Sequence, residues 1–120
     1  MRFITFVKMA ENVGNPPPAL VEAMGRELGD AFASGSILDA GGLSGMADST
    51  EIRIAGGQIT RTDGPYAEGK EVAGGYAILE ARSREEAVEG ARRVIELHAE
   101  HWPGWEGAVE VRQMFGHQER

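Results

Sequence analysis

Hydrophobic positions recur along the chain with two periods, one typical of strands and one typical of helices. Residues 3–9 carry β-branched and aromatic side chains on both alternating sets, which predicts a strand covered on both faces. A Gly/Asn/Pro-rich break at residues 12–18 follows, and after it apolar residues recur every fourth position: Leu20, Met24, Leu28 and Phe32. This spacing predicts an amphipathic helix over residues 17–34, with the prolines confined to its first turn.

The middle of the chain predicts four further strands. Residues 36–43 form an apolar run that ends in two glycines. The segments 51–54 and 58–62 alternate polar and apolar residues around Ala-Gly-Gly, which predicts a hairpin at the margin of a sheet. After a charged loop, residues 74–81 read as another strand with apolar side chains on both sides.

A second helix is predicted from a capping signal. Ser83 stands three residues before Glu86, the spacing of a capping box. An apolar stripe at helical spacing follows: Ala87, Ala91, Val94, Ile95 and His98. The pair Pro103-Gly104 ends this pattern, and the alternation of residues 107–115 predicts the last strand.

This order of elements predicts a single α+β domain over residues 1–120. It is the ferredoxin-like order β-α-β-β-α-β with an extra hairpin strand. Two helices can cover only one face of such a sheet, so apolar residues on the other face need a partner. A second copy packed sheet to sheet meets that need, and a homodimer is expected.

Composition and charge narrow the classes of function. The formal net charge of −7, with no visible basic patch, disfavours binding to nucleic acid or to an anionic membrane. The chain has no cysteine, and so neither disulfides nor a thiolate nucleophile. It shows no leader or membrane-spanning run, no phosphate-loop or dinucleotide fingerprint, and no Gly-x-Ser-x-Gly elbow. A soluble cytoplasmic protein without cofactor or metal is expected.

Residues 63–71 carry the densest chemistry: Asp-Gly-Pro-Tyr-Ala-Glu-Gly-Lys-Glu. Asp63 has two interpretations. It can accept hydrogen bonds from the backbone N–H groups of its own turn, a structural role that needs no ligand. Alternatively, a carboxylate beside a cleft, partly desolvated by Tyr66 and Tyr76, would have a raised pKa and could transfer a proton.

The remaining candidates come from the same loop and from the end of the second helix. His98 and His101 are the plausible imidazole partners for Asp63. The structural alternative, which the pattern favours for either histidine alone, is that His98 is a buried helix residue and that His101 complements the dipole at the helix C-terminus. Candidates for ligand binding share a polar or aromatic side chain near the expected cleft: Tyr66, Glu68, Lys70, Tyr76 and Trp102. The mixed charges of the loop are also compatible with an ordinary solvated surface, and the tryptophans with packing.

The motif at residues 63–71, followed by Gly74-Gly75-Tyr76, resembles the DGPF signature of the YCII-related proteins. His98-x-x-His101-Trp102 and the segment after it resemble one branch of that family, so the resemblance covers essentially the whole chain. Tyr66 stands for the usual Phe, and Gly69 for the usual Thr. The resemblance implies a dimeric α+β barrel with a cleft between sheet and helices.

The resemblance implies less about activity. Related YCII proteins include a dehydrochlorinase-like enzyme thought to use a His/Asp pair with the histidine on the first helix, but residues 17–34 contain no histidine here. Two classes of function remain. One is a small-ligand-binding or regulatory dimer. The other is a cofactor-independent enzyme that performs elimination or isomerisation by proton transfer between Asp63 and His98 or His101.

Overall fold

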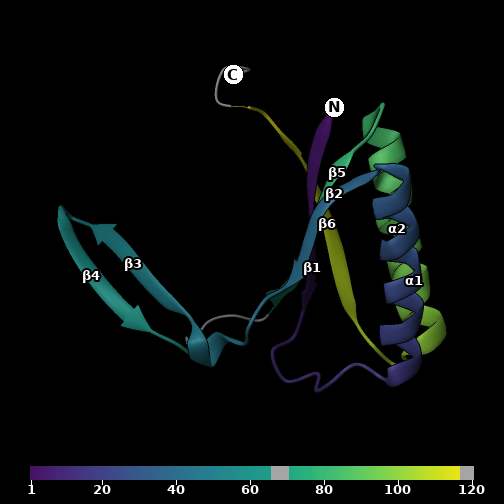
Figure 1. Ribbon diagram of the computed structural model, residues 1–120. Coiled ribbons are helices and arrows are strands. Elements are labelled where there is room, and N and C mark those ends of the chain that lie inside the picture. Colours follow the sequence, from purple (N-terminus) through teal and green to yellow (C-terminus); the bar gives the residue numbers. More distant parts are fainter. Residues whose placement is uncertain (66–70, 117–120) are drawn as a thin grey trace.

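The computed structural model describes residues 1–65 and 71–116 (Figure 1). Its elements in chain order are β1 (Arg2–Met9), α1 (Pro18–Ser34), β2 (Ile37–Gly42), the 3-10 turn η1 (Met46–Asp48), β3 (Thr50–Ala55), β4 (Gln58–Asp63), β5 (Val72–Glu80), α2 (Arg84–His101) and β6 (Gly107–Met114). The predicted succession of strands and helices is confirmed.

Four strands form an antiparallel sheet in the order β2-β5-β1-β6. With β3 and β4 set aside, this is the strand order of a ferredoxin-like β-α-β-β-α-β fold. Both helices lie on the same face of the sheet (Figure 1). The expected α+β architecture is therefore confirmed, and no helix of the described residues lies on the other face of the sheet.

The strand register assigns side chains to the two faces. Phe3 is opposite Leu79, and Thr5 is opposite Ala77, on the face toward the helices. Directly paired residues of an antiparallel sheet share a face, and neighbours along a strand alternate. The helix-free face, which we call the open face, therefore carries the intervening residues: Ile4, Phe6, Tyr76 and Ile78. Apolar residues on both faces of β1 match the sequence prediction.

Helix α2 begins after a capping serine, and helix α1 ends at a glycine. The Ser83 hydroxyl accepts a hydrogen bond of 3.1 Å from the Glu86 N–H, as the capping spacing predicts. Helix α1 ends at Gly35, whose φ of 82° lies in the left-handed region, where a residue without Cβ is favoured. None of the helices in the described residues is long and apolar enough to cross a membrane.

The core between sheet and helices consists of two separate clusters. One contains Phe3, Ala81 and Ala87, with Leu79 and Val111 packed against it. The other joins the two helices through the buried residues Leu20, Ala23 and Leu97, with Met24 and Trp102 alongside. Because the clusters do not merge, the fold leaves a hollow between the sheet and the helices.

The hairpin β3–β4 corrects one prediction. It forms a two-stranded sheet of its own rather than a margin of the main sheet. Its turn uses Gly56 and Gly57, both with positive φ, as a tight hairpin requires. Figure 1 shows the hairpin on the side of the sheet opposite the helices, projecting away from the body.

We call the hairpin, Thr50–Asp63, the arm. The radius of gyration is 16.2 Å, whereas a compact chain of this length has about 14 Å. The projecting arm accounts for the difference. The predicted alternation is correct, but the apolar set, Ile52, Ile54 and Ile59, is exposed in the part of the chain that the structure describes.

Candidate functional site

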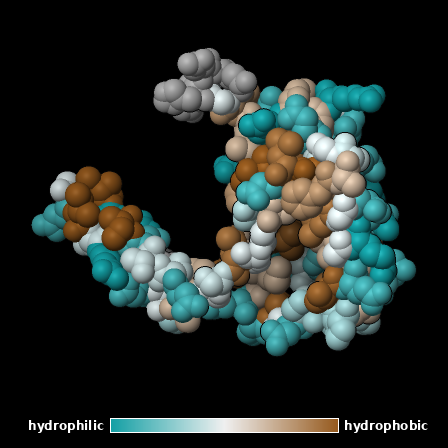
Figure 2. Space-filling model, in the orientation of Figure 1, coloured by the Kyte–Doolittle hydropathy of each residue, from teal (hydrophilic) through white to brown (hydrophobic). Residues whose placement is uncertain are grey.

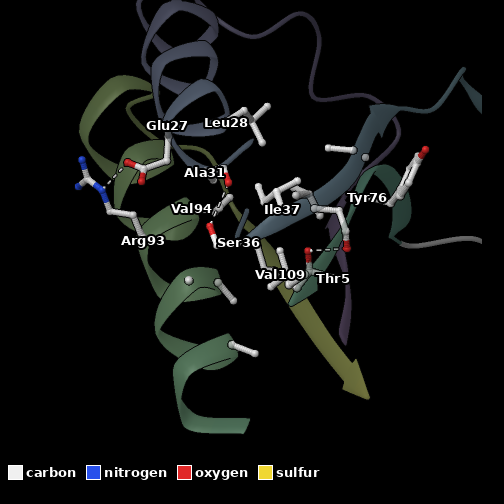
Figure 3. A pocket seen from close by; sticks show the side chains of 18 of the residues that line it. Thr5, Glu27, Leu28, Ala31, Ser36, Ile37, Tyr76, Arg93, Val94 and Val109 are labelled. Atoms are coloured by element: carbon white, nitrogen blue, oxygen red, sulfur yellow. Dashed lines mark hydrogen bonds and ion pairs between the residues drawn. The ribbon is translucent and has the colours of Figure 1, made fainter. Parts of the chain in front are cut away.

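A cavity of about 530 Å³ lies between the sheet and the two helices. We call it the sheet–helix cavity (Figure 3). Its lining from the helices includes Met24, Leu28, Ala31, Phe32, Ala87, Ala91 and Val94, and its lining from the strands includes Thr5, Val7, Ile37, Ala40, Ala77, Leu79 and Val109. Most of these side chains are apolar.

The Thr5 and Ser36 hydroxyls, which line the cavity, are both hydrogen-bonded to backbone carbonyls. The Thr5 hydroxyl donates to the Ala77 carbonyl at 3.4 Å. The Ser36 hydroxyl donates to the Ala31 carbonyl at 3.2 Å, so this contact joins the end of α1 to the start of β2. Hydroxyl donors occupied in this way leave an essentially apolar lining.

A salt bridge lies where the helices face each other beside the cavity. Arg93 of α2 donates through Nε to Glu27 Oε1 of α1 at 3.0 Å, and both residues contribute to the cavity lining (Figure 3). Both side chains are partly exposed, so the pair adds little to stability. Glu80 and Glu86 are further charged residues of the lining.

The cavity exists because small residues occupy apolar positions of the helices and strands. Ala87 and Ala91 belong to the apolar stripe of α2, and Ala31 adjoins the stripe of α1. Ala77 lies on the sheet below them. A methyl side chain at these positions cannot reach the opposite layer. The family resemblance implied a cleft between sheet and helices, whereas the residues themselves predicted only the apolar stripes, and the repeated alanines were the pattern that could have indicated the cavity.

Asp63 lies at the end of β4, at the base of the arm. Its Oδ1 accepts hydrogen bonds from the Thr50 hydroxyl at 2.9 Å and from Arg61 Nε at 3.1 Å. Its side chain is 65% exposed. The bond from Thr50 joins the two strands of the arm at its base, while Arg61 lies on the same strand as Asp63. Asp63 thus has a structural role like the one predicted, although with side-chain donors. Tyr76 does not flank this carboxylate as the proton-transfer interpretation expected, because it binds a different aspartate.

The glycine of the motif has a clear steric reason. The Gly64 N–H donates to the Ser49 carbonyl at 2.7 Å, which joins the end of β4 to the segment after η1. A Cβ at Gly64 would overlap the Met46 carbonyl oxygen. The predicted ligand-binding residues Tyr66, Glu68 and Lys70 lie outside the described residues.

The histidines lie at the C-terminal end of α2. His98 is buried, its Nδ1 donates to the Val94 carbonyl at 2.8 Å, and its ring packs on Trp105 at a centroid distance of 4.3 Å. His101 is the last residue of the helix and is 3.8 Å from Glu100. Trp102 packs against the interhelical cluster. These contacts agree with the interpretation of the three residues as packing and helix-end groups.

The structure does not bring Asp63 and the histidines together within one chain. The arm and the helices lie on opposite sides of the sheet (Figure 1). His98, His101 and Trp102 do not line the sheet–helix cavity, and neither does Asp63. Within residues 1–65 and 71–116, no group of three or more His, Asp or Glu side chains is placed to hold a metal ion.

A pair that the sequence analysis missed is Tyr76 with Asp39 on the open face. The Tyr76 hydroxyl donates to Asp39 Oδ2 at 2.9 Å, while Asp39 Oδ1 accepts from the Ala40 N–H at 3.0 Å. The hydrogen bond to this carboxylate raises the pKa of Tyr76, so the phenol stays protonated at neutral pH. A Cβ at Gly41 would lie 3.0 Å from the Tyr76 ring, so the glycine makes room for it.

A second polar pair lies on the same face. Lys8 Nζ donates to Glu110 Oε1 at 3.0 Å, and this hydrogen bond lowers the pKa of Glu110. Arg112 contacts the other oxygen of the same carboxylate at 3.0 Å. The open face therefore combines apolar residues with charges that are already paired. Asp39 and Tyr76 are 37 residues apart in the sequence, and Lys8 and Glu110 are 102 residues apart, so a local sequence pattern does not reveal these pairs.

Two comparisons with known proteins bear on this geometry. The family model of the YCII-related domain matches residues 1–114. No curated protein sequence matches the chain. The match covers all of the strands and helices described above.

Proposed function

The chain belongs to the YCII-related family, and from that premise we propose that it binds a small, predominantly apolar molecule in the sheet–helix cavity. The observation that carries the proposal is the cavity of about 530 Å³ between two separate core clusters. Pockets for small molecules typically have about 300–1,000 Å³ and an apolar lining with few polar groups. The cavity meets both conditions.

The lining also specifies the chemistry of the ligand. The Thr5 and Ser36 hydroxyls already donate to backbone carbonyls, so an occupant gains little from them. Burial of apolar ligand surface against the alanines and leucines supplies the binding free energy. A polar end of the ligand would lie toward Arg93 and Glu27, which line the cavity together with Glu80 and Glu86. Aromatic or aliphatic molecules with one polar end fit this arrangement.

A cavity-filling substitution tests the proposal. Ala31→Leu places a larger side chain in the lining from α1. We expect the affinity for the apolar fluorescent dye anilinonaphthalene sulfonate to fall at least about tenfold, or roughly 1.4 kcal/mol. Fluorescence titration measures the affinity, and thermal-shift assays with small aromatic carboxylates and phenols extend it to other ligands.

The matched control is Ala33→Leu, which makes the same change on the same helix at an exposed residue outside the cavity lining. It should leave dye binding unchanged. Equal affinity of the wild-type protein and of the folded Ala31→Leu protein would place the dye elsewhere and refute the cavity as the binding site.

We further propose that the protein is a homodimer that packs through the open face. Ile4, Phe6 and Ile78 are only partly buried there, and no helix covers them. The charged side chains of this face include three basic and three acidic residues: Arg2, Lys8, Arg112, Asp39, Glu80 and Glu110. The face is thus balanced although the chain carries −7, which favours pairing with an identical face.

The expected result of light scattering at micromolar concentration is a mass of two chains. Phe6→Glu should shift the mass to that of one chain, because it places a carboxylate directly opposite Glu110 on the open face of each copy. When two such faces meet, four carboxylates repel one another across the contact. A wild-type mass of one chain at every concentration would contradict the homodimer without affecting the test of the cavity.

A further inference from the structure

We propose that the arm is a clasp that grips the second copy of the chain, with its apolar face packed on that copy. This inference rests on the homodimer proposed above and adds a second contact surface to it. Three isoleucines give the arm its apolar face: Ile52 is 65% exposed, Ile54 is 69% exposed and Ile59 is 72% exposed. Ile54 is directly opposite Ile59, and Ile52 lies two residues along the same strand.

The isoleucines therefore form one continuous patch on one side of the two-stranded ribbon, where Arg61 lies directly opposite Ile52 and Thr50 pairs with Asp63 at the base. The other side is polar, because it carries Glu51, Arg53, Thr60 and Thr62. Figure 2 shows hydrophobic residues gathered near the far end of the arm, separated from the body by an open hollow. An isolated hairpin is at best marginally stable in water, so a partner that covers the patch is needed to keep the arm folded.

The position of the arm favours a second copy as that partner. The arm leaves the body on the same side as the open face, opposite the helices (Figure 1). A second chain that covers the open face would thus lie beside the arm. In a two-fold dimer the same contact is made twice, so both arms are covered at once.

The area of the open face, compared with the area that a stable interface buries, also favours a contact made by the arm. Four strands about 4.8 Å apart, with some eight residues at roughly 3.3 Å each, present an open face of about 500 Å². A standard stable interface buries about 800 Å² on each partner. The sheet alone falls short of that value, and an arm laid on the partner supplies additional apolar contact.

The charges on the arm fit an identical chain better than a strongly charged partner. Arg53 pairs with Glu51 at 3.1 Å, and Arg61 pairs with Asp63 at 3.1 Å. The arm therefore presents no net charge to select a nucleic acid, an anionic membrane or a basic protein. Its contact with the partner depends on the isoleucines.

Thiol labelling tests the clasp, because the chain contains no cysteine. Ile54→Cys places the only thiol on the apolar face of the arm, and Thr60→Cys places it on the polar face as the matched control. Both variants are labelled with a small aromatic disulfide reagent at a concentration where light scattering shows two chains. We expect labelling of Ile54→Cys to be at least about tenfold slower than that of Thr60→Cys, and equal rates in denaturant.

Each outcome of the labelling and light-scattering experiments supports or contradicts the proposed clasp. Slower labelling of Ile54→Cys in the dimer supports the clasp. Dissociation of the dimer by Ile54→Cys, with the Thr60→Cys dimer intact, supports it as well. Equal labelling rates in a sample of two-chain mass overturn the clasp while the homodimer stands. A wild-type mass of one chain at every concentration overturns both.

Discussion

Replacement of Phe3 by alanine is expected to lower the free energy of unfolding by about 3–5 kcal/mol. The Phe3 side chain has 0% exposure and packs in β1 against Ala81 and Ala87. Because the methyl groups of Ala81 and Ala87 cannot reach into the vacated space, much of the ring volume would remain as a cavity beside Leu79 and Val111. Such a loss is a large part of the roughly 5–15 kcal/mol that stabilises a typical domain. Urea denaturation followed by circular dichroism measures it.

Phe115→Ala is the matched control, because it removes the same ring from a residue that is 58% exposed. Its effect should stay within about 0.5 kcal/mol. If the two variants unfolded at the same urea concentration, Phe3 would not hold the core cluster together, and the separation of the core into two clusters would need another explanation.

The hydrophobic periods predicted nearly every element of the fold. Strand β1, helix α1 and the capped start of α2 lie within a residue or two of their predicted bounds. These elements have strong local patterns, because each buries one side of a strand or one stripe of a helix. The Ser83 cap is local in the same sense, since its hydrogen bond spans three residues.

Features that depend on contacts between distant segments were not predicted. The arm alternates like a strand at the margin of a sheet, but alternation cannot show which sheet a strand joins. β2 instead has β5 as its neighbour, and the arm pairs only within itself. The pair of Tyr76 with Asp39 depends on the pairing of β2 with β5, so a local sequence motif does not predict it.

The candidate site shows the same limit. Asp63 and the histidines were the predicted catalytic residues, because charged and titratable residues are conspicuous in a sequence. The cavity arises from small side chains, namely Ala31, Ala77 and their neighbours, which come from separate helices and strands and meet only in the folded chain. The catalytic roles suggested for Asp63, His98 and His101 stay predictions.

Gly64→Ala is expected to destabilise the base of the arm by roughly 1–3 kcal/mol. The added Cβ would overlap the Met46 carbonyl oxygen, which is backbone and cannot rotate away, and the shift would strain the hydrogen bond from the Gly64 N–H to Ser49. Native-state hydrogen exchange should therefore show faster exchange of the β3 and β4 amides. Gly45→Ala is the control, because nothing lies within 4 Å of its Cβ position, and it should leave exchange unchanged. Equal exchange in both variants would mean that η1 yields to the methyl group, and the glycine of the motif would then have no steric role at the arm.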